Sequence, residues 1–434
     1  MSVEWQDTTI GAVCLKVFSG GTPISTNPSY YGGAIPWLRT KEVNYGKVFD
    51  TEQHITELGL ENSSAKLVPV NSVIVAMYGN GDTAGRVAVN KIPLTTNQAC
   101  CNLVVDPAKA DFRFVYYFLM GRYQELVDLK NGGAQQNLNG QLIKAFPFCA
   151  PDVCEQSAIA DVFESLDDRI TLLRETNATL EAIAQALFKS WFVDFDPVRA
   201  KMEGRAPEGM DEATAALFPD ALEESELGWV PKGWRFGEVG DFAELKKGTV
   251  NPGMQPDTVF EHFSLPAFDD GQRPVIERGA TIKSNKTPVP SDAVLLSKLN
   301  PHIPRIWLPG TSGRNAICST EFLVFQPTAA SCRELIYCVF SSTSFIGRLQ
   351  QLVTGTSNSH QRIKPDQVAK IEHVVPTPTV VRAFESLAAP LFERVHANRM
   401  QAQTLATIRD TLLPRLISGQ LRLPEAQALL KETV

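Results

Sequence analysis

The residues from which metal sites and covalent cross-links are built are scarce in this sequence of 434 residues. It contains six histidines and eight cysteines. No two cysteines form a Cys-x-x-Cys pair, and no histidine stands at ligand spacing from them. We therefore expect neither a zinc site nor a disulfide framework, and we predict that the cysteines are small, reduced core residues.

Long hydrophobic runs are also absent. No apolar run approaches the ~20 residues that a membrane-spanning helix needs, and the first residues lack the basic and then apolar pattern of a signal peptide. We expect a soluble, cytoplasmic protein without a membrane partner.

Motifs of catalysis are missing as well. The sequence has no Walker A loop, no nucleophile elbow and no strand-plus-glycine motif for S-adenosylmethionine or a dinucleotide. Gly79, Gly81 and Gly85 suggest a phosphate-binding loop, but a strand-like run follows them where a helix would be needed, so we interpret them as a hairpin turn. These absences favour a binding or scaffolding role, with no catalytic residue and no metal ligand.

The negative charge is confined to one part of the chain. The formal net charge is −7, yet residues 151–235 carry 8 Lys and Arg against 18 Asp and Glu, whereas residues 1–150 carry 12 of each. The remaining segments are close to neutral and can carry basic faces. Net charge therefore does not exclude a nucleic-acid partner.

Two long segments, residues 155–192 and 380–417, repeat one pattern at a constant offset of 225 residues; Leu166 matches Leu391, for example, and Leu180 matches Leu405. In the first copy, apolar residues recur every seven positions with a second set three residues behind, which is a heptad with its a and d positions filled. Both segments are therefore predicted to be long helices.

The two helices can be aligned antiparallel so that the numbers of facing residues sum to 575. Large residues then face small ones along much of the seam, and Asn177 faces Asn398, so that two amides would fix the register. The alternative is that each helix packs on its own domain and the asparagines point to water. The predicted seam comprises Phe163, Leu166, Ile170, Leu173, Asn177, Leu180, Leu187, Trp191, Phe384, Leu391, Asn398, Leu405 and Leu412.

The segments that precede each helix also repeat. Each begins with a tryptophan and a short strand-like run, continues through strand-like runs that end at Pro107 or Pro327, and then shows one aromatic helix and a polar loop. The predicted fold is α+β: two globular mixed α/β domains and two long helices that pair as an antiparallel coiled coil, with a pseudo-twofold internal repeat. The predicted domains are 1–151, a long helix at 152–196, an acidic connector with one short helix at 197–233, a second domain at 234–376, and a second helix with its tail at 377–434.

Four aromatic residues at the end of the first helix exceed what a helix pair can bury. They are Phe188, Trp191, Phe192 and Phe195. We expect some of them to hold the connector or a partner.

Several phrases of the sequence, among them LFKSWFVDFDPV, LLSKLNP and ICSTEFLVF, together with the repeat order, resemble the specificity subunit of type I restriction–modification systems. The resemblance spans nearly the whole chain. It implies two target-recognition domains that read an asymmetric two-part DNA sequence in phage defence, and helices that dock two adenine-N6 methyltransferase subunits, to which motor-nuclease restriction subunits attach. It also implies that this chain has no catalytic site and binds no cofactor, because S-adenosylmethionine, ATP and magnesium belong to the partner subunits.

Under this interpretation the helical rod is expected to set the spacing between the two half-sites. Arginine, glutamine and asparagine side chains discriminate bases, and lysine side chains more often neutralise phosphates. The candidate DNA-binding residues of the first domain are Arg39, Lys41, Asn97, Gln98, Gln135 and Gln136. Those of the second domain are Lys246, Lys247, Lys298, Asn300, His302, Arg305, His360, Gln361 and Arg362. Arg305 and Arg86 occupy nearly equivalent places, which also fits a shared structural ion pair.

Two other functions are considered. Residues 27–30, Asn-Pro-Ser-Tyr, resemble the Asn-Pro-Pro-aromatic tetrad with which adenine-N6 methyltransferases hold a flipped base, although the third residue departs from the tetrad. A self-contained methyltransferase is therefore one alternative, and a simple turn is the competing interpretation of the motif. The other alternative is a helical protein–protein adaptor with no role on DNA.

Overall fold

The computed structural model describes residues 5–79, 82–129, 137–225, 228–310, 313, 315–353 and 361–433. The chain folds into two compact units, the first made of residues 1–172 and 401–434 and the second of residues 173–400. The two long helices are α5 (Val153–Phe192) and α12 (Pro378–Ile417), each of 40 residues. Their bounds agree with the predicted ones to within two residues at each end, and each unit contains about half of each helix. Within the described ranges no helix is both long and apolar enough to cross a membrane.

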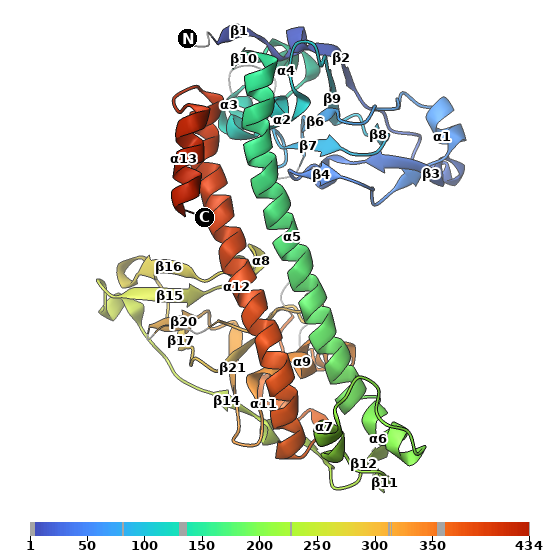
Figure 1. The fold of residues 1–434 in the computed structure, drawn as a ribbon, viewed down its shortest axis with the longest axis vertical. Helices are drawn as coiled ribbons and strands as arrows, with labels where there is room; N and C mark the ends of the chain where they lie inside the picture. Colours follow the sequence, from blue (N-terminus) through green and yellow to red (C-terminus); the bar gives the residue numbers. More distant parts are fainter. Residues whose placement is uncertain are drawn as a thin grey trace. The chain divides into compact units, whose positions relative to one another are not determined.

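The first unit contains two sheets and a separate strand pair (Figure 1). The larger sheet has the order β2–β9–β6–β7–β4, the smaller has the order β5–β3–β8, and β1 pairs with β10. The bounds are β1 Gln6–Thr9, β2 Cys14–Ser19, β3 Tyr31–Leu38, β4 Lys47–Val48, β5 His54–Ile55, β6 Val73–Ala76, β7 Val87–Asn90, β8 Thr95–Thr96, β9 Cys100–Val105 and β10 Pro147–Ala150. The predicted hairpin turn falls between β6 and β7, where Gly85 has a φ of +92° that favours glycine.

The second unit repeats this topology except that β4 of the first unit and β17 of the second have no counterpart. Its sheets have the orders β14–β21–β18–β19 and β16–β15–β20–β17, and β13 pairs with β22. In both units the smaller sheet contains one parallel pair, β3 with β8 and β15 with β20, among antiparallel ones. The bounds are β13 Arg235–Glu238, β14 Ala243–Lys246, β15 Val259–Phe263, β16 Val275–Arg278, β17 Thr287–Pro288, β18 Val294–Ser297, β19 Ile306–Trp307, β20 Ala316–Cys318, β21 Phe322–Pro327 and β22 Glu372–Val375. The internal repeat predicted from the sequence is therefore present in the strand pairing.

Two local predictions were wrong, both because a predicted element is divided. The aromatic helix of each half is two helices, α2 (Phe112–Gly121) and α3 (Tyr123–Asp128) in one unit, α9 (Arg333–Ser341) and α10 (Thr343–Gln351) in the other. The hydroxyl of Ser342 accepts a hydrogen bond from the backbone N–H of Phe345, so it caps α10 and restarts the helix. Similarly, the buried strand predicted before each helix is two strands, β8 and β9 or β20 and β21.

The connector contains more structure than the one short helix expected. It forms α6 (Asp196–Met202), α7 (Glu212–Ala216) and a hairpin of β11 (Leu222–Ser225) with β12 (Gly228–Pro231). The remaining helices are α1 (Glu57–Glu61), α4 (Gly140–Ala145), α8 (Leu265–Asp269), α11 (Pro365–Ala369) and α13 (Leu423–Thr433). Six short 3-10 turns complete the described part of the chain.

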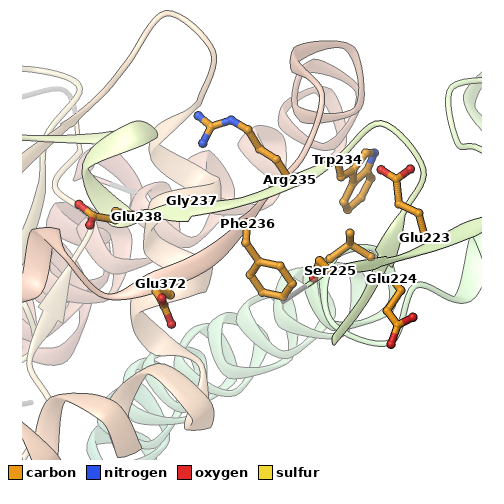
Figure 2. Close-up of a pocket in the computed structure, with 10 residues that line it drawn as sticks. Glu223, Glu224, Ser225, Trp234, Arg235, Phe236, Gly237, Glu238 and Glu372 are labelled. Carbon is orange, nitrogen blue, oxygen red and sulfur yellow. The ribbon is translucent and has the colours of Figure 1, made fainter. Parts of the chain in front are cut away.

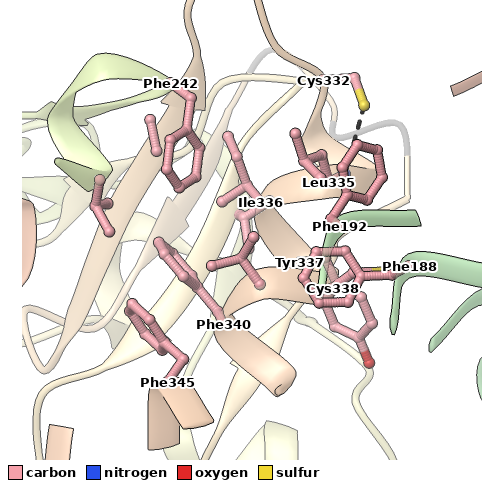
Figure 3. Packing of buried hydrophobic residues seen from close by; sticks show 14 of the residues in the cluster. Phe188, Phe192, Phe242, Cys332, Leu335, Ile336, Tyr337, Cys338, Phe340 and Phe345 are labelled. Carbon is pink, nitrogen blue, oxygen red and sulfur yellow. Dashed lines mark hydrogen bonds between the residues drawn. The ribbon is translucent and has the colours of Figure 1, made fainter. Parts of the chain in front are cut away.

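The aromatic residues at the end of α5 hold the connector, as expected. The ring of Trp191 lies 5.0 Å from that of Phe218, and the ring of Phe192 lies 5.8 Å from that of Trp234 (centroid distances). Phe195 contacts Trp234 as well, at 5.9 Å. Figure 3 shows Phe188 and Phe192 packed with side chains of α9 in the same cluster. Connector, helix and second domain thus share one apolar core.

In the first unit, α5 binds both α12 and the helix α2. Arg409 of α12 forms an ion pair with Asp167 of α5 (Nη1 to Oδ1, 2.7 Å), and the hydroxyl of Tyr117 donates to the same carboxylate at 2.8 Å. Glu164 accepts hydrogen bonds from Lys47 and Arg113 at 2.8 and 2.9 Å. Burial opposes ionisation of Glu164, but these hydrogen bonds outweigh it and lower its pKa.

In the second unit, two amides face each other between the long helices. The Nδ2 group of Asn398 donates to Oδ1 of Asn177 at 2.9 Å, and the Nδ2 group of Asn177 donates to the carbonyl oxygen of Val395 at 3.2 Å. The rings of Trp191 and Phe384, another pair whose numbers sum to 575, are 6.1 Å apart. Of the thirteen residues assigned to the seam, ten are buried, and Leu180, Leu187 and Leu391 are half-buried.

Candidate nucleic-acid interface

The two basic candidates that follow β3 share one acidic partner. Arg39 contacts Glu52 at 2.6 Å (Nη2 to Oε2) and Glu42 at 3.5 Å (Nε to Oε1), and Lys41 also pairs with Glu52. The carboxylate of Glu42 accepts the backbone N–H of Arg39 at 3.2 Å, which closes the turn Thr40–Glu42. These contacts fix the direction of both cations, and Lys41 remains largely exposed.

The amide candidates of the first domain lie beside this turn. The backbone N–H of Asn97 donates to the carbonyl of Leu38 at 2.9 Å, so Asn97 is next to Arg39 in space although 58 residues separate them in sequence. The Oδ1 atom of Asn97 is buried and has no hydrogen-bond partner within the described ranges. Gln98 is exposed and accepts a hydrogen bond from the hydroxyl of Thr22. Gln135 and Gln136 lie outside the described residues.

In the second domain, four candidates belong to the loop between β18 and β19. Lys298 and Asn300 are half-buried, and His302 is exposed. Asn300 has a φ of +51°, which asparagine tolerates better than most residues, and its Oδ1 is buried without a described partner. Arg305 makes a bidentate ion pair with Asp269 (Nε to Oδ1, 2.7 Å; Nη2 to Oδ2, 2.8 Å), and its side chain is only 14% exposed.

Arg305 therefore has a structural partner. Its hydrogen bonds with Asp269 raise the pKa of its guanidinium further, and reading a base would require that pair to break. Arg86 in the first unit is similar, because it pairs with Asp82 at 2.6 Å. The two arginines nevertheless use partners from different parts of their domains, 36 and 4 residues away.

The polar segment before α11 joins this loop. The backbone N–H of Asn300 donates to the carbonyl of Gln361 at 2.8 Å, and Arg362 forms a β-bridge with Leu299. The guanidinium of Arg362 holds Glu321 at 3.1 Å through both Nε and Nη2. His360 lies outside the described residues. Thus Lys298, Asn300, Gln361 and Arg362 are brought together from two distant segments.

Lys246 and Lys247 stand apart from that group. Lys246 ends β14 and pairs with Glu244 at 2.8 Å, whereas Lys247 is exposed. Since β14 borders β21 on the side opposite β18, the two lysines flank the same sheet.

Comparison with known proteins finds type I restriction specificity subunits among the relatives of this chain. Residues 2–182 match the family model of the type I restriction modification DNA specificity domain. Over 425 residues the chain is 27% identical to the type I restriction enzyme MjaIX specificity subunit of Methanocaldococcus jannaschii, which covers 94% of this chain and 92% of that protein. Over nearly its whole length this chain is therefore similar to type I restriction specificity subunits, and its residues 2–182 match their DNA specificity domain.

One further relative is of the same kind, and one solved structure has the same fold. The type I restriction enzyme HindI specificity subunit of Haemophilus influenzae is 24% identical over 346 residues, which are 69% of this chain and 74% of that one. The crystal structure of the type I restriction-modification S subunit from M. genitalium has a TM-score of 0.55, with 16% identity and 96% of both chains covered, and it shows the same fold.

The Asn-Pro-Ser-Tyr motif is a turn of a kind that this chain uses twice. Oδ1 of Asn27 accepts the backbone N–H of Ser29 at 3.1 Å and caps the 3-10 turn Pro28–Tyr30. In the second unit, Asn251 caps the turn Pro252–Met254 in the same way, with Gly253 as the donor. A capping role accounts for the asparagine in both places, so the motif gives no support to a base-holding methyltransferase site.

One pocket of this chain has the wrong charge for DNA. It has a volume of about 460 Å³ and lies between the hairpin β11–β12 and the strand pair β13–β22 (Figure 2). Among the described residues that line it, the only basic one is Arg235, which already pairs with Asp241 at 2.9 Å. Four glutamates also line the pocket: Glu223, Glu224, Glu238 and Glu372. Because their carboxylates repel phosphate, the pocket is not part of the DNA interface.

Proposed function

We propose that this chain is the DNA sequence-recognition subunit of a type I restriction–modification complex. It reads an asymmetric target in two parts, one half-site for each recognition domain, and contributes no catalytic group itself. The observation that carries this proposal is the similarity to a specificity subunit over 94% of the chain. The repeated domain topology supports it, because two similar domains with different side chains are suited to two different half-sites.

The proposed domains are target recognition at 1–151 and 234–376, long helices at 152–196 and 377–434, and an acidic connector at 197–233. Each of α5 and α12 has 40 residues and is therefore ~60 Å long at ~1.5 Å per residue. We propose that this pair sets the number of unread base pairs between the half-sites.

The proposed partners are double-stranded DNA, two adenine-N6 methyltransferase subunits and the restriction subunits. The exposed faces of the two long helices are the proposed docking surface for the methyltransferase subunits. S-adenosylmethionine, ATP and magnesium would bind the partners. The proposed DNA contacts are the described candidates, with Arg305 the weakest because of its ion pair.

The test is to produce the chain together with its methyltransferase partner and to map N6-methyladenine across a genome by single-molecule sequencing. The expected result is an asymmetric motif of two parts with a fixed gap. Methylation at one short palindrome, or no preferred sequence from an intact complex, would refute the two-domain interpretation. Binding of S-adenosylmethionine by the isolated chain would instead support a self-contained methyltransferase.

A further inference from the structure

In the first unit, three distant segments meet at the end of β6, and we name this place junction 1. The backbone N–H of Met77 donates to the carbonyl of Ala99 at 2.8 Å, and the carbonyl of Met77 accepts from Leu138 at 3.2 Å. Residues 97–100 form a turn in which the backbone carbonyl of Asn97 accepts a hydrogen bond from the backbone N–H of Cys100 at 3.1 Å. Junction 1 therefore consists of residues 77–79, 97–99 and 138.

The second unit contains the same arrangement at the end of β18, which we name junction 2. The backbone N–H of Lys298 donates to the carbonyl of Glu321 at 2.9 Å, and the carbonyl of Lys298 accepts from Ile363 at 3.1 Å. The backbone carbonyl of Ser319 accepts a hydrogen bond from the backbone N–H of Phe322 at 2.9 Å, which closes the corresponding turn. Junction 2 therefore consists of residues 298–300, 319–321 and 361–363.

A further backbone hydrogen bond ties each junction to the smaller sheet of its domain. Asn97 donates to Leu38 at 2.9 Å, and Ser319 donates to Phe263 at 2.9 Å. Both acceptors end the strand that pairs in parallel with its neighbour, β3 or β15. Each junction is thus fixed between two sheets, which is the rigid support that a recognition site requires.

The backbones of the two junctions correspond, but their side chains do not. Tyr78 matches Leu299 and Gln98 matches Thr320, and both Gln98 and Thr320 are exposed. The other matched pairs are Met77 with Lys298, Asn97 with Ser319, and Ala99 with Glu321. A structural role common to both domains would favour similar residues at these positions, whereas reading two different sequences requires different ones.

Each junction presents side chains whose geometry suits particular bases. Junction 1 presents the exposed amide of Gln98 beside Asn97, whose Oδ1 atom is buried, and glutamine binds adenine through two hydrogen bonds in the major groove. Junction 2 has Lys298 and Arg362, and arginine and lysine bind the O6 and N7 atoms of guanine. Glu321 of the same junction holds Nε and Nη2 of Arg362 at 3.1 Å, much as Asp269 holds Arg305, but Arg362 is 48% exposed and Arg305 only 14%, so the pair directs the guanidinium of Arg362 without burying it.

We propose that the two junctions are the base-reading sites of this chain: Gln98, held in place by the turn that begins at Asn97, reads an A·T pair in one half-site, and Arg362 with Lys298 reads a G·C pair in the other. The assignment rests on the proposed DNA-recognition function and adds to it which side chains read which kind of base pair. The ligand of each junction is the major-groove edge of a DNA duplex.

The test uses the complete complex with its methyltransferase partner and selects bound duplexes from a pool with random sequence. Gln98→Ala is expected to reduce the preference for A·T at a position of one half-site by about 5- to 150-fold, the range for a two-bond base contact. Arg362→Ala is expected to reduce the preference for G·C in the other half-site by a similar factor. Each change should leave the opposite half-site as it is in the wild type.

Two matched controls remove side chains of the same kind at exposed positions away from the junctions. Gln6→Ala on β1, which belongs to the separate strand pair β1–β10, corresponds to Gln98→Ala, and Lys283→Ala in the second domain removes one cation, as Arg362→Ala does. Both controls should leave both half-sites unchanged. Equal melting temperatures of all four variants and the wild type will show that the domains remain folded.

The outcomes separate this inference from the function on which it rests. If the wild type selects a two-part sequence but Gln98→Ala and Arg362→Ala leave both half-sites unchanged, the junction assignment is wrong and the proposed function stands. A uniform loss of affinity for all sequences would also overturn the assignment, because it indicates phosphate contacts. If the wild type selects no sequence, the proposed function itself fails.

Discussion

The facing amides of Asn177 and Asn398 allow a quantitative test of what aligns the long helices. Asn177 is 8% exposed and Asn398 is 1% exposed, so neither amide can turn to water without opening the helix pair. Replacing Asn398 with leucine leaves the buried Oδ1 atom of Asn177 without its donor, which costs about 1–3 kcal/mol. Replacing Asn177 with leucine removes the acceptor of Asn398 and should cost a similar amount.

The double variant should behave differently. With leucine at both positions no amide is left unpaired, and two apolar side chains of similar size occupy the seam, so its stability should return to the wild-type value or exceed it. The two changes are therefore expected to be coupled by about 1–3 kcal/mol. Gln401→Leu, an exposed amide on the same helix, is the control and should have no such coupling.

Hydrogen–deuterium exchange of the backbone amides of α5 and α12 is the appropriate assay, because a chain of several domains does not unfold in one step. A local cost of about 1–3 kcal/mol corresponds to about 5- to 150-fold faster exchange near residues 177 and 398 in each single variant, since about 1.4 kcal/mol is a tenfold change. The double variant should exchange at the wild-type rate. If hydrogen exchange is unchanged in either single variant, leaving one buried amide without its partner does not destabilise the helix pair, and the reasoning is refuted.

Three further predictions concern the cores and the electrostatics of the two units. Phe218→Ala should detach the connector from the end of α5 at a cost of about 3–5 kcal/mol, seen as faster proteolysis within residues 203–217. The pKa of Glu164 is lowered in the folded protein, so its ionised form stabilises the first unit at pH values above the ordinary pKa of 4.5, and this stabilisation is lost as the pH falls through the lower folded pKa. In Glu164→Gln, the urea concentration at the unfolding midpoint should therefore fall less steeply as the pH is lowered. Gly310→Ala would place a Cβ atom against the imidazole of His396 and should lower the melting temperature, whereas Gly347→Ala, in open space on α10, should raise it slightly.

The sequence predicted the elements whose periodicity is long and regular. Forty residues of heptad pattern, repeated at a constant offset, allowed both long helices to be placed within two residues of their observed ends. The order of the domains was also predicted, because corresponding strands recur in the same order at offsets near this value, such as 221 residues between β6 and β18 and 229 between β1 and β13. Patterns of this length average out the local exceptions that mislead shorter predictions.

Short elements were predicted less well because their boundaries depend on single contacts. Nothing in the apolar pattern of residues 333–353 shows that Ser342 ends one helix and caps the next. The connector was expected to have little structure because it is rich in proline, glycine and acidic residues. Its order comes instead from Phe218, whose ring docks on Trp191 of α5, while Trp234 at the start of the second domain docks on Phe192 of the same helix.

The candidate DNA contacts were chosen by residue type, and residue type alone cannot distinguish a cation that faces the solvent from one already held by a carboxylate. Arg305 shows the difficulty, because it has the right chemistry for guanine but is bound by Asp269 through two hydrogen bonds. The information that was missing is which segments meet. Junctions 1 and 2 each combine three segments that are far apart in sequence, and only the backbone hydrogen bonds show that their positions correspond.

Because junctions 1 and 2 share one backbone arrangement, we expect that such a chain can change its target by exchanging side chains alone. The hydrogen bonds that build each junction are made by backbone atoms, and the exposed side chain of Gln98 contacts the hydroxyl of Thr22 at the surface. Gln98 and Thr320 occupy matched, exposed positions with the same backbone support. Exchanging the two residues should therefore alter the preferred bases without lowering the melting temperature of either domain. A large loss of stability on this exchange would show that the junction side chains are structural, and that the difference between the two domains has a cause other than reading two half-sites.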